Sequence, residues 1–363
     1  MLVKINRMRF MRNYMKSVFI TVGSIALVVL TYVLSVYLFV FDPSFSRAEM
    51  TEEKIKKYFM TEEFYSQYLS EKSWFESKNP RHEYVVSHDG LKLAALVLPF
   101  DKNDSKETEE SLGTVILLHG YHSDPVREFV FLAHFYHNLG YNVIMPYQRA
   151  HGESEGEYIT LGLKERFDIR DWMLKANELF GSGKPLFVEG ISMGCATTLM
   201  SLGFDNLPAN LRGIIADCGF TSPKAIIMKV LSKDKKIPTS SLIFTVGNAM
   251  SQSKIGVDLE EYSTFDAIDF NKTRAEQIPI LFIHGADDDY VPLYMTSENF
   301  MRCVGNFSEL EGGDLGNVVV TPNPQASKYK YVQIEGAKHA ISNIINPEKY
   351  HSEVRKFLEK YGK

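Results

Sequence analysis

Residues 18–41, VFITVGSIALVVLTYVLSVYLFVF, are 24 consecutive residues without a charged side chain, and this run limits what the chain can fold into. As a helix rising about 1.5 Å per residue, the run is roughly 36 Å long, enough to cross a hydrocarbon core of about 30 Å with some tilt. A cleavable signal peptide is the alternative, but its apolar region spans only about 7–15 residues and ends at small residues. This run ends in Phe39-Val40-Phe41-Asp42-Pro43, so we expect an uncleaved transmembrane anchor over residues 18–41.

Residues 1–17 carry five basic side chains and no acidic one: Lys4, Arg7, Arg9, Arg12 and Lys16. A basic flank of this kind favours retention of the amino terminus in the cytoplasm. We therefore predict a cytoplasmic segment over 1–17 and a large domain outside the cytoplasm, in a single-pass membrane protein.

The rest of the chain is mildly acidic. The whole sequence has 40 Lys and Arg against 45 Asp and Glu, and subtracting the five amino-terminal cations leaves 35 basic against 45 acidic groups, or −10. This balance argues against nucleic acid as a partner. The three cysteines, Cys195, Cys218 and Cys303, are too few for a disulfide framework and lack metal-site spacing, so we expect buried small hydrophobes.

Residues 42–80 are charge-rich with scattered aromatics, which predicts a stalk or linker, with a helix beginning near Thr51. From residue 81 the pattern changes. EYVVSHDGLKLAALVLPF predicts a hairpin that turns at Asp89-Gly90. Apolar strands then alternate with amphipathic helices to residue 363, which predicts a mostly parallel eight-stranded sheet with helices on both faces. The strands are expected at Thr114–His119, Asn142–Pro146, Pro185–Gly190, Gly213–Asp217, Pro279–His284 and Tyr329–Ile334, and the helices near 125–138, 163–180, 193–203, 293–304 and 347–361.

Ser192 stands between two glycines where a predicted strand turns into a helix, in Gly190-Ile191-Ser192-Met193-Gly194. Glycines two before and two after a sharp strand-to-helix turn let the backbones pass closely, and the helix amino terminus favours negative charge at the hydroxyl. The motif alone is weak, because chance produces it in roughly one chain of this length in ten, and a merely tight turn is the alternative.

An acid, a base and an amide donor accompany this serine. Asp287, Asp288 and Asp289 follow the strand PILFIHG, on the edge where open α/β sheets place their sites. His339 follows the last strand, and the order serine, acid, histidine is that of one of the known triads. After the strand that ends at His119, the backbone N–H of Tyr121 is positioned to face the same point as that of Met193.

Five motifs in order, HGYHSD, QRAHGESEG, GISMGCATT, HGADDDYVP and GAKHA, resemble signatures of the α/β-hydrolase superfamily, in its serine aminopeptidase-like and acylglycerol-lipase-like branch. The layout is similar to uncharacterised bacterial membrane-anchored hydrolases of that branch, and the resemblance covers residues 83–363. It implies an α/β-hydrolase fold over 81–363 with Ser192 as nucleophile, His339 as base, and Tyr121 and Met193 as oxyanion-hole amides. Its pattern H-G-x-x-D-x-x-V-P selects Asp288 as the acid, and Asp217 is the fallback.

The sequence departs from the family in two places. Cys195 stands where the family usually has Gly or Ala, and a Gly/Asn/Pro-rich insertion runs from about Glu309 to Ser327, for which a surface flap near the site is one hypothesis. Residues 221–277 are predicted to form a small helical cap, whose apolar side chains either line an acyl-binding wall or only pack the cap onto the domain.

Several polar residues near these motifs are predicted to be structural. His119 and His151 are expected to hold their turns by hydrogen bonds, and Arg149 to brace its loop. The helix LKERFDIRDWMLKANELF is expected to present a solvated, ion-paired face that carries Glu165, Arg166, Asp168, Arg170 and Asp171.

The favoured function is a membrane-anchored serine hydrolase that cleaves a small-molecule acyl ester, with no metal or organic cofactor. Lipase- or lysophospholipase-like, thioesterase and peptidase activities remain open, as does a non-catalytic binding module tethered to the membrane. The oligomeric state is not predicted.

Overall fold

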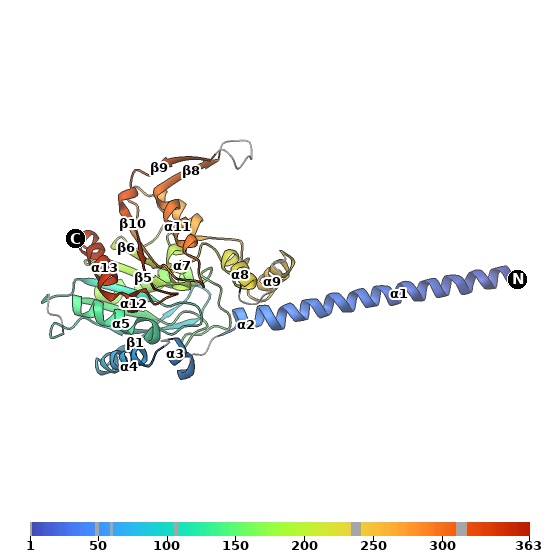
Figure 1. The fold of residues 1–363 in the computed structure, drawn as a ribbon, viewed down its shortest axis with the longest axis horizontal. Coiled ribbons are helices and arrows are strands. Elements are labelled where there is room, and N and C mark those ends of the chain that lie inside the picture. The colour runs from blue at the N-terminus through green and yellow to red at the C-terminus, as the bar shows by residue number, and fades with distance from the viewer. Residues whose placement is uncertain (1, 48–50, 59–60, 105–107, 234–240, 310–317) are drawn as a thin grey trace. The chain divides into compact units, whose positions relative to one another are not determined.

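The computed structural model describes residues 2–47, 51–58, 61–104, 108–233, 241–309 and 318–363 (Figure 1). The chain divides into two compact units. One comprises Met1–Ser46 with Thr239–Asp258, and the other comprises Arg47–Pro238 with Leu259–Lys363. The cap expected at 221–277 is therefore shared between the two units.

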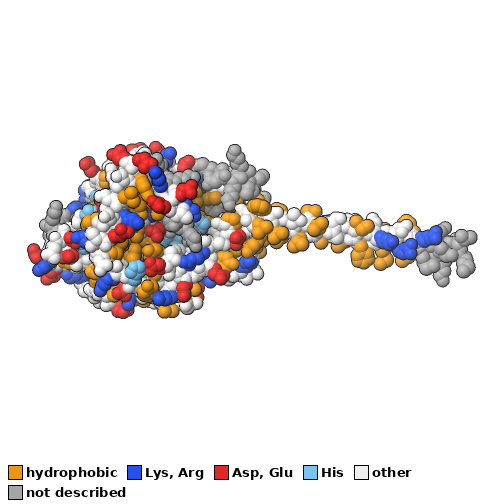
Figure 2. Space-filling model, turned by 90° about the horizontal axis from the view of Figure 1, so that it is seen from below, with side chains coloured by type: hydrophobic (Ala, Val, Ile, Leu, Met, Phe, Trp, Pro, Cys, Tyr) orange, Lys and Arg blue, Asp and Glu red, His pale blue; other side chains and the backbone are white. Residues whose placement is uncertain are grey.

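The first unit is built on one long helix. α1 (Leu2–Val36) continues as the π-helix η1 (Tyr37–Phe41) and the short α2 (Asp42–Phe45). Among the described residues, the stretch Arg9–Phe45 is the one helix long and apolar enough to cross a membrane. Figure 2 shows apolar side chains along this helix and basic side chains near its amino end. Phe19 and Ile20 are each 70% exposed, so none of the described residues covers α1 at this point.

A second segment of the first unit packs on the carboxyl end of that helix. α9 (Ser241–Lys254) contacts η1 and α1, and Val36, Phe41, Phe45 and Phe244 are buried there. The ring of Phe41 stacks on Tyr37 at 5.9 Å and the ring of Phe45 stacks on Phe41 at 5.0 Å between centroids.

The second unit contains one eight-stranded sheet in the order β1-β2-β4-β3-β5-β6-β7-β10. β1 and β2 pair antiparallel with each other and β2 pairs antiparallel with β4, while every other pairing in the sheet is parallel. The predicted hairpin and the mostly parallel sheet are both confirmed. The strand bounds are β1 (Arg81–Val86), β2 (Lys92–Leu98), β3 (Gly113–Leu118), β4 (Tyr141–Pro146), β5 (Leu186–Ile191), β6 (Leu211–Asp217), β7 (Ile280–Gly285) and β10 (Tyr329–Ile334).

Helices cover both faces of this sheet, and the strands divide their side chains between two cores. In β3, Val115 and Leu117 join one core and Ile116 and Leu118 join the other, as the two-residue repeat of a strand requires. The first core includes α4 (Glu62–Ser77), α5 (Pro125–Leu139) and α13 (Pro347–Tyr361). The second includes α6 (Glu165–Phe180), α7 (Met193–Ser201), α10 (Thr264–Thr273) and α11 (Leu293–Val304). The remaining helices of this unit are α3 (Glu52–Tyr58), α8 (Pro223–Lys233), η2 (Ala326–Lys328) and α12 (Ser342–Ile345).

The segment expected to be a stalk contributes to the domain. α3 begins at Glu52, as predicted, but α4 packs against α5. Tyr68 and Phe75 of α4 are 3% and 2% exposed and lie in the first core. The scattered aromatics of this stretch are therefore partly core residues, which their helical spacing allows.

The insertion around 309–327 is attached away from the predicted site. Its described parts are the strands β8 (Gly305–Glu309) and β9 (Val318–Pro322), which pair antiparallel. Asn323 bonds to the Cys303 carbonyl and the Gln277 side chain, at the amino ends of β7 and β10. Parallel strands carry their sites at the opposite, carboxyl ends, so the described ends of the insertion do not lie beside the predicted site. Residues 310–317 fall outside the described ranges.

Candidate active site

The backbone at Ser192 adopts a rare conformation. Its φ of 56° and ψ of −115° are strained for a residue with a side chain. A Cβ on Gly190 would lie 2.3 Å from the Gly194 carbonyl oxygen, and one on Gly194 would lie 1.8 Å from the Leu118 carbonyl oxygen. Only glycine fits at either position, so the spacing of this motif has a steric cause. The turn presents Ser192 at the amino end of α7, at the carboxyl edge of the sheet.

Three side chains predicted from separate motifs meet at this edge. The His339 Nε2 lies 2.9 Å from the Ser192 Oγ, and the His339 Nδ1 lies 2.7 Å from the Asp288 Oδ2. An Nδ1–H that donates to the carboxylate leaves Nε2 free to accept the serine hydroxyl proton. Ser192 follows β5, Asp288 follows β7 and His339 follows β10, so the sheet brings together residues that are 147 and 51 positions apart.

Asp288 is surrounded by donors. Its Oδ1 accepts the backbone N–H groups of Tyr290 at 2.9 Å and Val291 at 3.0 Å. Burial alone would raise the pKa of Asp288, but hydrogen bonds from His284 and His339 outweigh it and hold that pKa well below its usual range. The carboxyl is therefore ionised at neutral pH, the state needed to orient and stabilise a histidine cation.

His284 is a second histidine on the same carboxylate, and sequence reasoning assigned it no role. Its Nε2 lies 3.0 Å from the Val291 carbonyl oxygen and 3.2 Å from the Asp288 Oδ2, and its Nδ1 lies 2.7 Å from the Thr296 Oγ1. The Thr296 hydroxyl also lies 3.2 Å from the Gly219 carbonyl oxygen, to which it donates. The His284 Nε2 faces two acceptors, the Val291 carbonyl and the Asp288 carboxylate, so an Nε2–H is the donor there. The available signal was its position in the strand PILFIHG, four residues before the acid.

The loop after β3 lies against the serine. A Cβ on Gly120 would be 3.2 Å from the Ser192 Cβ, and the Gly120 N–H donates to the buried Glu128 carboxylate at 2.6 Å. Tyr121 follows in this loop, and Met193 is the first residue of α7, whose amino terminus the Ser192 side chain does not cap. The oxyanion-hole role of the Tyr121 and Met193 amides stays a prediction.

Substrate access to these groups is partial. Ser192 is 6% exposed, whereas the His339 side chain is 21% exposed. The ring of Tyr290 is 5.1 Å from that of His339 and is also partly exposed. The imidazole and this tyrosine therefore face solvent together, and the serine lies beneath them.

His119 and His151 hold their turns, as predicted. The His119 Nδ1 donates to the Gly120 carbonyl oxygen at 2.8 Å, and its Nε2 accepts the Gln148 N–H at 3.0 Å. His151 bonds in the same way to the Arg149 carbonyl oxygen and the His122 N–H. Burial lowers the pKa of both rings, to about 4 for His151, so both are neutral.

The helix around 163–180 was expected to present Glu165 and Asp168 on a solvated face, and this expectation is wrong. Glu165 and Asp168 are 1% and 4% exposed, so they do not belong to a solvated face. Arg149 makes two 2.7 Å bonds to Asp168 and also bonds to Asp89, bracing its loop as expected. Glu165 accepts the N–H groups of Thr160 and Gly162. A carboxylate can be buried only if such partners compensate for its lost hydration, and these contacts allow both acids to lie inside the protein.

A second set of buried acids lies under the serine turn. The hydroxyls of Tyr136 and Tyr350 both bond to Glu189, the latter at 2.7 Å, and the Tyr350 oxygen is also 3.1 Å from the Asp217 Oδ2. Burial raises the pKa of Glu189 to about 7 and that of Asp217 well above its usual value. Asp217 lies in this cluster rather than on His339, so the fallback acid is not the partner of the base.

One group among the described residues offers donor atoms for a metal. Atoms of Cys218, Asp288 and His339 lie within 4.8 Å of one another, and two of the three already share the hydrogen bond of the site. All three cysteines are free and buried, as predicted.

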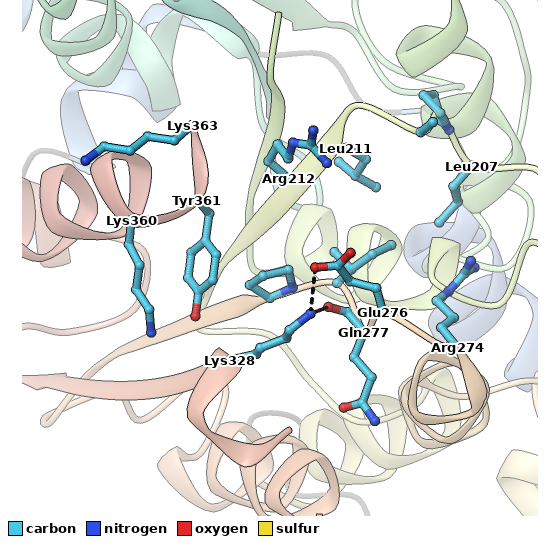
Figure 3. Close-up of a pocket in the computed structure, with 14 residues that line it drawn as sticks. Leu207, Leu211, Arg212, Arg274, Glu276, Gln277, Lys328, Lys360, Tyr361 and Lys363 are labelled. Atoms are coloured by element: carbon cyan, nitrogen blue, oxygen red, sulfur yellow. Dashed lines mark hydrogen bonds and ion pairs between the residues drawn. The ribbon is translucent and has the colours of Figure 1, made fainter. Parts of the chain in front are cut away.

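A separate pocket of about 460 Å³ opens at the amino ends of β6 and β7. Figure 3 shows its basic side chains, with Lys328 bonded to Glu276 and to the Gln277 carbonyl. The other basic side chains that line it are Arg212, Arg274, Lys360 and Lys363. None of the residues of the serine site lines this pocket.

Comparisons with known proteins agree with this architecture. No family model matches the chain. The chain is 24% identical over 283 residues to the uncharacterized protein YqkD of Bacillus subtilis (strain 168). The aligned residues are 77% of this chain and 83% of that protein.

Solved structures share the fold at low identity. The Pyrococcus furiosus esterase Pf2001 superposes with a TM-score of 0.55 at 20% identity, over 79% of this chain and 94% of that one. The α/β hydrolase GrgF from Penicillium sp. sh18 superposes with a TM-score of 0.52 at 14% identity, over 78% of this chain and 99% of that one. The Pyrococcus horikoshii acylaminoacyl peptidase superposes with a TM-score of 0.51 at 16% identity, over 78% of this chain but 42% of that one. Together with the sheet order, these likenesses show that the chain has the α/β-hydrolase fold, as its five motifs predict.

Proposed function

We propose that this protein is a membrane-anchored serine hydrolase that cleaves an acyl ester through an acyl-enzyme. The observation that carries the proposal is the continuous chain of contacts from the Ser192 Oγ through the His339 ring to the Asp288 carboxylate, at 2.9 and 2.7 Å. The strained turn under Ser192 supports it, because strain of this kind persists where a function requires the geometry.

The mechanism follows from the protonation states. His339 Nε2 takes the hydroxyl proton as the Ser192 oxygen attacks the ester carbonyl, and the ionised Asp288 stabilises the resulting imidazolium. The tetrahedral oxyanion is held by the N–H groups of Tyr121 and Met193, each worth about 3 kcal/mol by analogy with single donor deletions. His339 then protonates the leaving alcohol. Water activated by the same ring attacks the acyl-enzyme and releases the acid.

The apolar helix supports membrane anchoring. Its exposed apolar length and the cations at its amino end favour an uncleaved span with a cytoplasmic amino terminus and an extracytoplasmic hydrolase domain. Protease treatment of intact cells tests the orientation: loss of the domain with survival of an amino-terminal tag is expected, and a protected domain contradicts it.

Labelling with a fluorophosphonate probe tests the chemistry. The native chain is expected to label and the Ser192→Ala variant is not; a native chain that resists labelling while folded would favour a binding module instead. p-Nitrophenyl esters of rising chain length, thioesters and peptide amides then separate the esterase from the thioesterase and peptidase alternatives. The fold likeness to an esterase favours ester cleavage.

A further inference from the structure

A cavity of about 300 Å³ lies between the helices α4, α5, α12 and α13, all of which belong to the second unit (Figure 1). Sites for small molecules have volumes of about 300–1,000 Å³, so this cavity has room for a small ligand. Ser192, Asp288 and His339 do not line it. The cavity is therefore separate from the proposed active site.

Two side chains that line this cavity keep a buried polar atom without a hydrogen bond. Asn343 on α12 is 4% exposed, and its Nδ2 has no partner among the described residues. The Nε2 of His351 on α13 also lacks a partner within the described chain. Buried polar groups in folded proteins are almost always paired. Two unpaired atoms at one cavity indicate that their partner enters through the cavity.

The charges around the cavity favour a neutral ligand. Among the described residues that line it, Glu71 is the one acid and none is a lysine or arginine. The Glu71 Oε2 already lies 2.6 Å from the Nδ1 of His134. Burial lowers the pKa of His351 to about 4, so this ring is neutral at neutral pH. An anion would lie beside Glu71 with no lysine or arginine to compensate, and a cation would compete with His134 for the same carboxylate.

The lining matches a molecule with hydroxyl groups on its edge and an apolar face. A hydroxyl both donates and accepts, so it can accept from the Asn343 amide and can pair with the His351 Nε2 in either tautomer. The His351 ring is held by the ring of Phe135, which stacks on it with centroids 4.0 Å apart. Phe131 and Ile344 also line the cavity and are only partly buried, which leaves apolar surface for C–H groups.

We propose that this cavity is a second ligand site, which binds a neutral sugar. Hydroxyls of the sugar pair with Asn343 and His351, and the C–H face of its ring packs on Phe131 and Ile344. The site goes beyond the proposed hydrolase function and does not depend on it. Sugar binding is therefore expected to be unchanged in the Ser192→Ala variant.

Tryptophan fluorescence gives a direct readout of this site. The chain has two tryptophans. Trp74 stacks on His134, a lining residue, with ring centroids 3.9 Å apart, whereas Trp172 is 1% exposed in the second core. A ligand in the cavity should alter the emission of Trp74 and leave that of Trp172 unchanged, so a Trp74→Phe variant should lose the response.

The titration uses full-length protein in polyoxyethylene ether micelles, because this detergent carries no sugar. The probes are the neutral sugars glucose, galactose and N-acetylglucosamine, with ethanolamine as the cation and citrate as the anion. At least one of the sugars is expected to give a saturable change with a Kd of about 1 mM or tighter. Ethanolamine and citrate are expected to give none.

Two variants and one matched control test the residues. Asn343→Leu and His351→Phe are each expected to weaken sugar binding about tenfold, since each removes one hydrogen bond. Asn343→Leu should not lower the melting temperature, because it removes an unpaired polar group, and His351→Phe keeps a ring for Phe135 to stack on. Asn299→Leu is the control, because Asn299 is 1% exposed with an unpartnered Nδ2 in the described chain but lies on α11, away from the cavity lining. It is expected to leave sugar binding unchanged.

Three results would overturn the proposal. The first is no saturable change with any of the three sugars, which would mean that water alone pairs with Asn343 and His351. The second is tighter binding of ethanolamine or citrate than of the sugars. The third is native sugar affinity in both folded variants, or an equal loss in the Asn299→Leu control.

Discussion

Asp217 ends β6 and Asp288 follows the neighbouring parallel strand β7, and both are buried, yet their surroundings shift their pKa values in opposite directions. Asp288 receives two backbone N–H groups and two histidines, which hold its pKa low. Asp217 has the Tyr350 hydroxyl as a donor, shared with Glu189, and burial raises its pKa well above its usual value. Two acids at the same edge of the sheet thus differ in the hydrogen-bond donors around them, and this difference separates their pKa values.

Asparagine substitution gives the largest expected contrast between the two acids. Asn copies the shape and the donor of a protonated carboxyl but cannot carry a negative charge. Asp288→Asn should lower kcat about 10⁴-fold, whereas Asp217→Asn should stay within about tenfold of the native enzyme. Initial rates with p-nitrophenyl butyrate measure both. Comparable losses in the two variants would mean that the acids are not distinguished by charge.

Substitution of the second histidine, His284, tests whether its hydrogen bond positions the Asp288 carboxylate. His284→Leu deletes the Nε2–H that faces the carboxylate and should lower kcat about tenfold with KM unchanged, since the donor orients the acid without touching substrate. His284→Gln restores a donor near the same place and should recover part of the rate. Equal activity in the Leu and Gln variants, or a change confined to KM, would remove His284 from the positioning of Asp288.

The raised pKa of the buried Glu189 predicts that the stability of the fold depends on pH. This pKa is about 7 in the folded state against an ordinary value of 4.5, so between these values the unfolded chain loses a proton that the folded chain keeps. The free energy of unfolding should fall by up to about 3 kcal/mol as pH rises from 4.5 to 7, and level off above 7. Glu189→Gln should flatten this dependence. Melting temperatures at pH 5 and pH 8 measure it, and parallel shifts in both proteins would contradict it.

Tyr350→Phe has the smallest expected effect. The variant loses the hydroxyl shared by Glu189 and Asp217, which should cost about 1–3 kcal/mol of stability because a buried acceptor loses its donor. Ester hydrolysis should stay within about twofold of the native rate at 25 °C. A large loss of activity in folded protein would connect this cluster to the chemistry after all.

The sequence was most informative where the causes of structure are local. The predicted starts and ends of the six parallel strands agree with the structure within about two residues, because apolar runs bounded by turns define them. The segments that hold Ser192, Asp288 and His339 were predicted for the same reason, because each follows a strand and parallel strands end at one edge. The choice of Asp288 among the three adjacent acids came from the resemblance to the family pattern.

Contacts between distant segments were not predictable in this way. Glu165 and Asp168 lie on what the helical repeat indicates is a polar face, and only the loop beside them explains their burial. His284 occupies an ordinary inward position of a strand, and its contact with Asp288 depends on how the following loop folds back. The pairing of α9 with η1 and α1 joins segments about 200 residues apart, and no periodicity in either segment predicts it.

The first unit is assembled from two segments that lie far apart in the chain, Met1–Ser46 and Thr239–Asp258. A protease cut after Ser46 would separate these segments and leave α9 without α1 and η1, its contacts within the unit. The eight-stranded sheet and the site at Ser192 belong to the other unit, so such a cut would expose apolar side chains of α9, Phe244 among them, without severing the sheet.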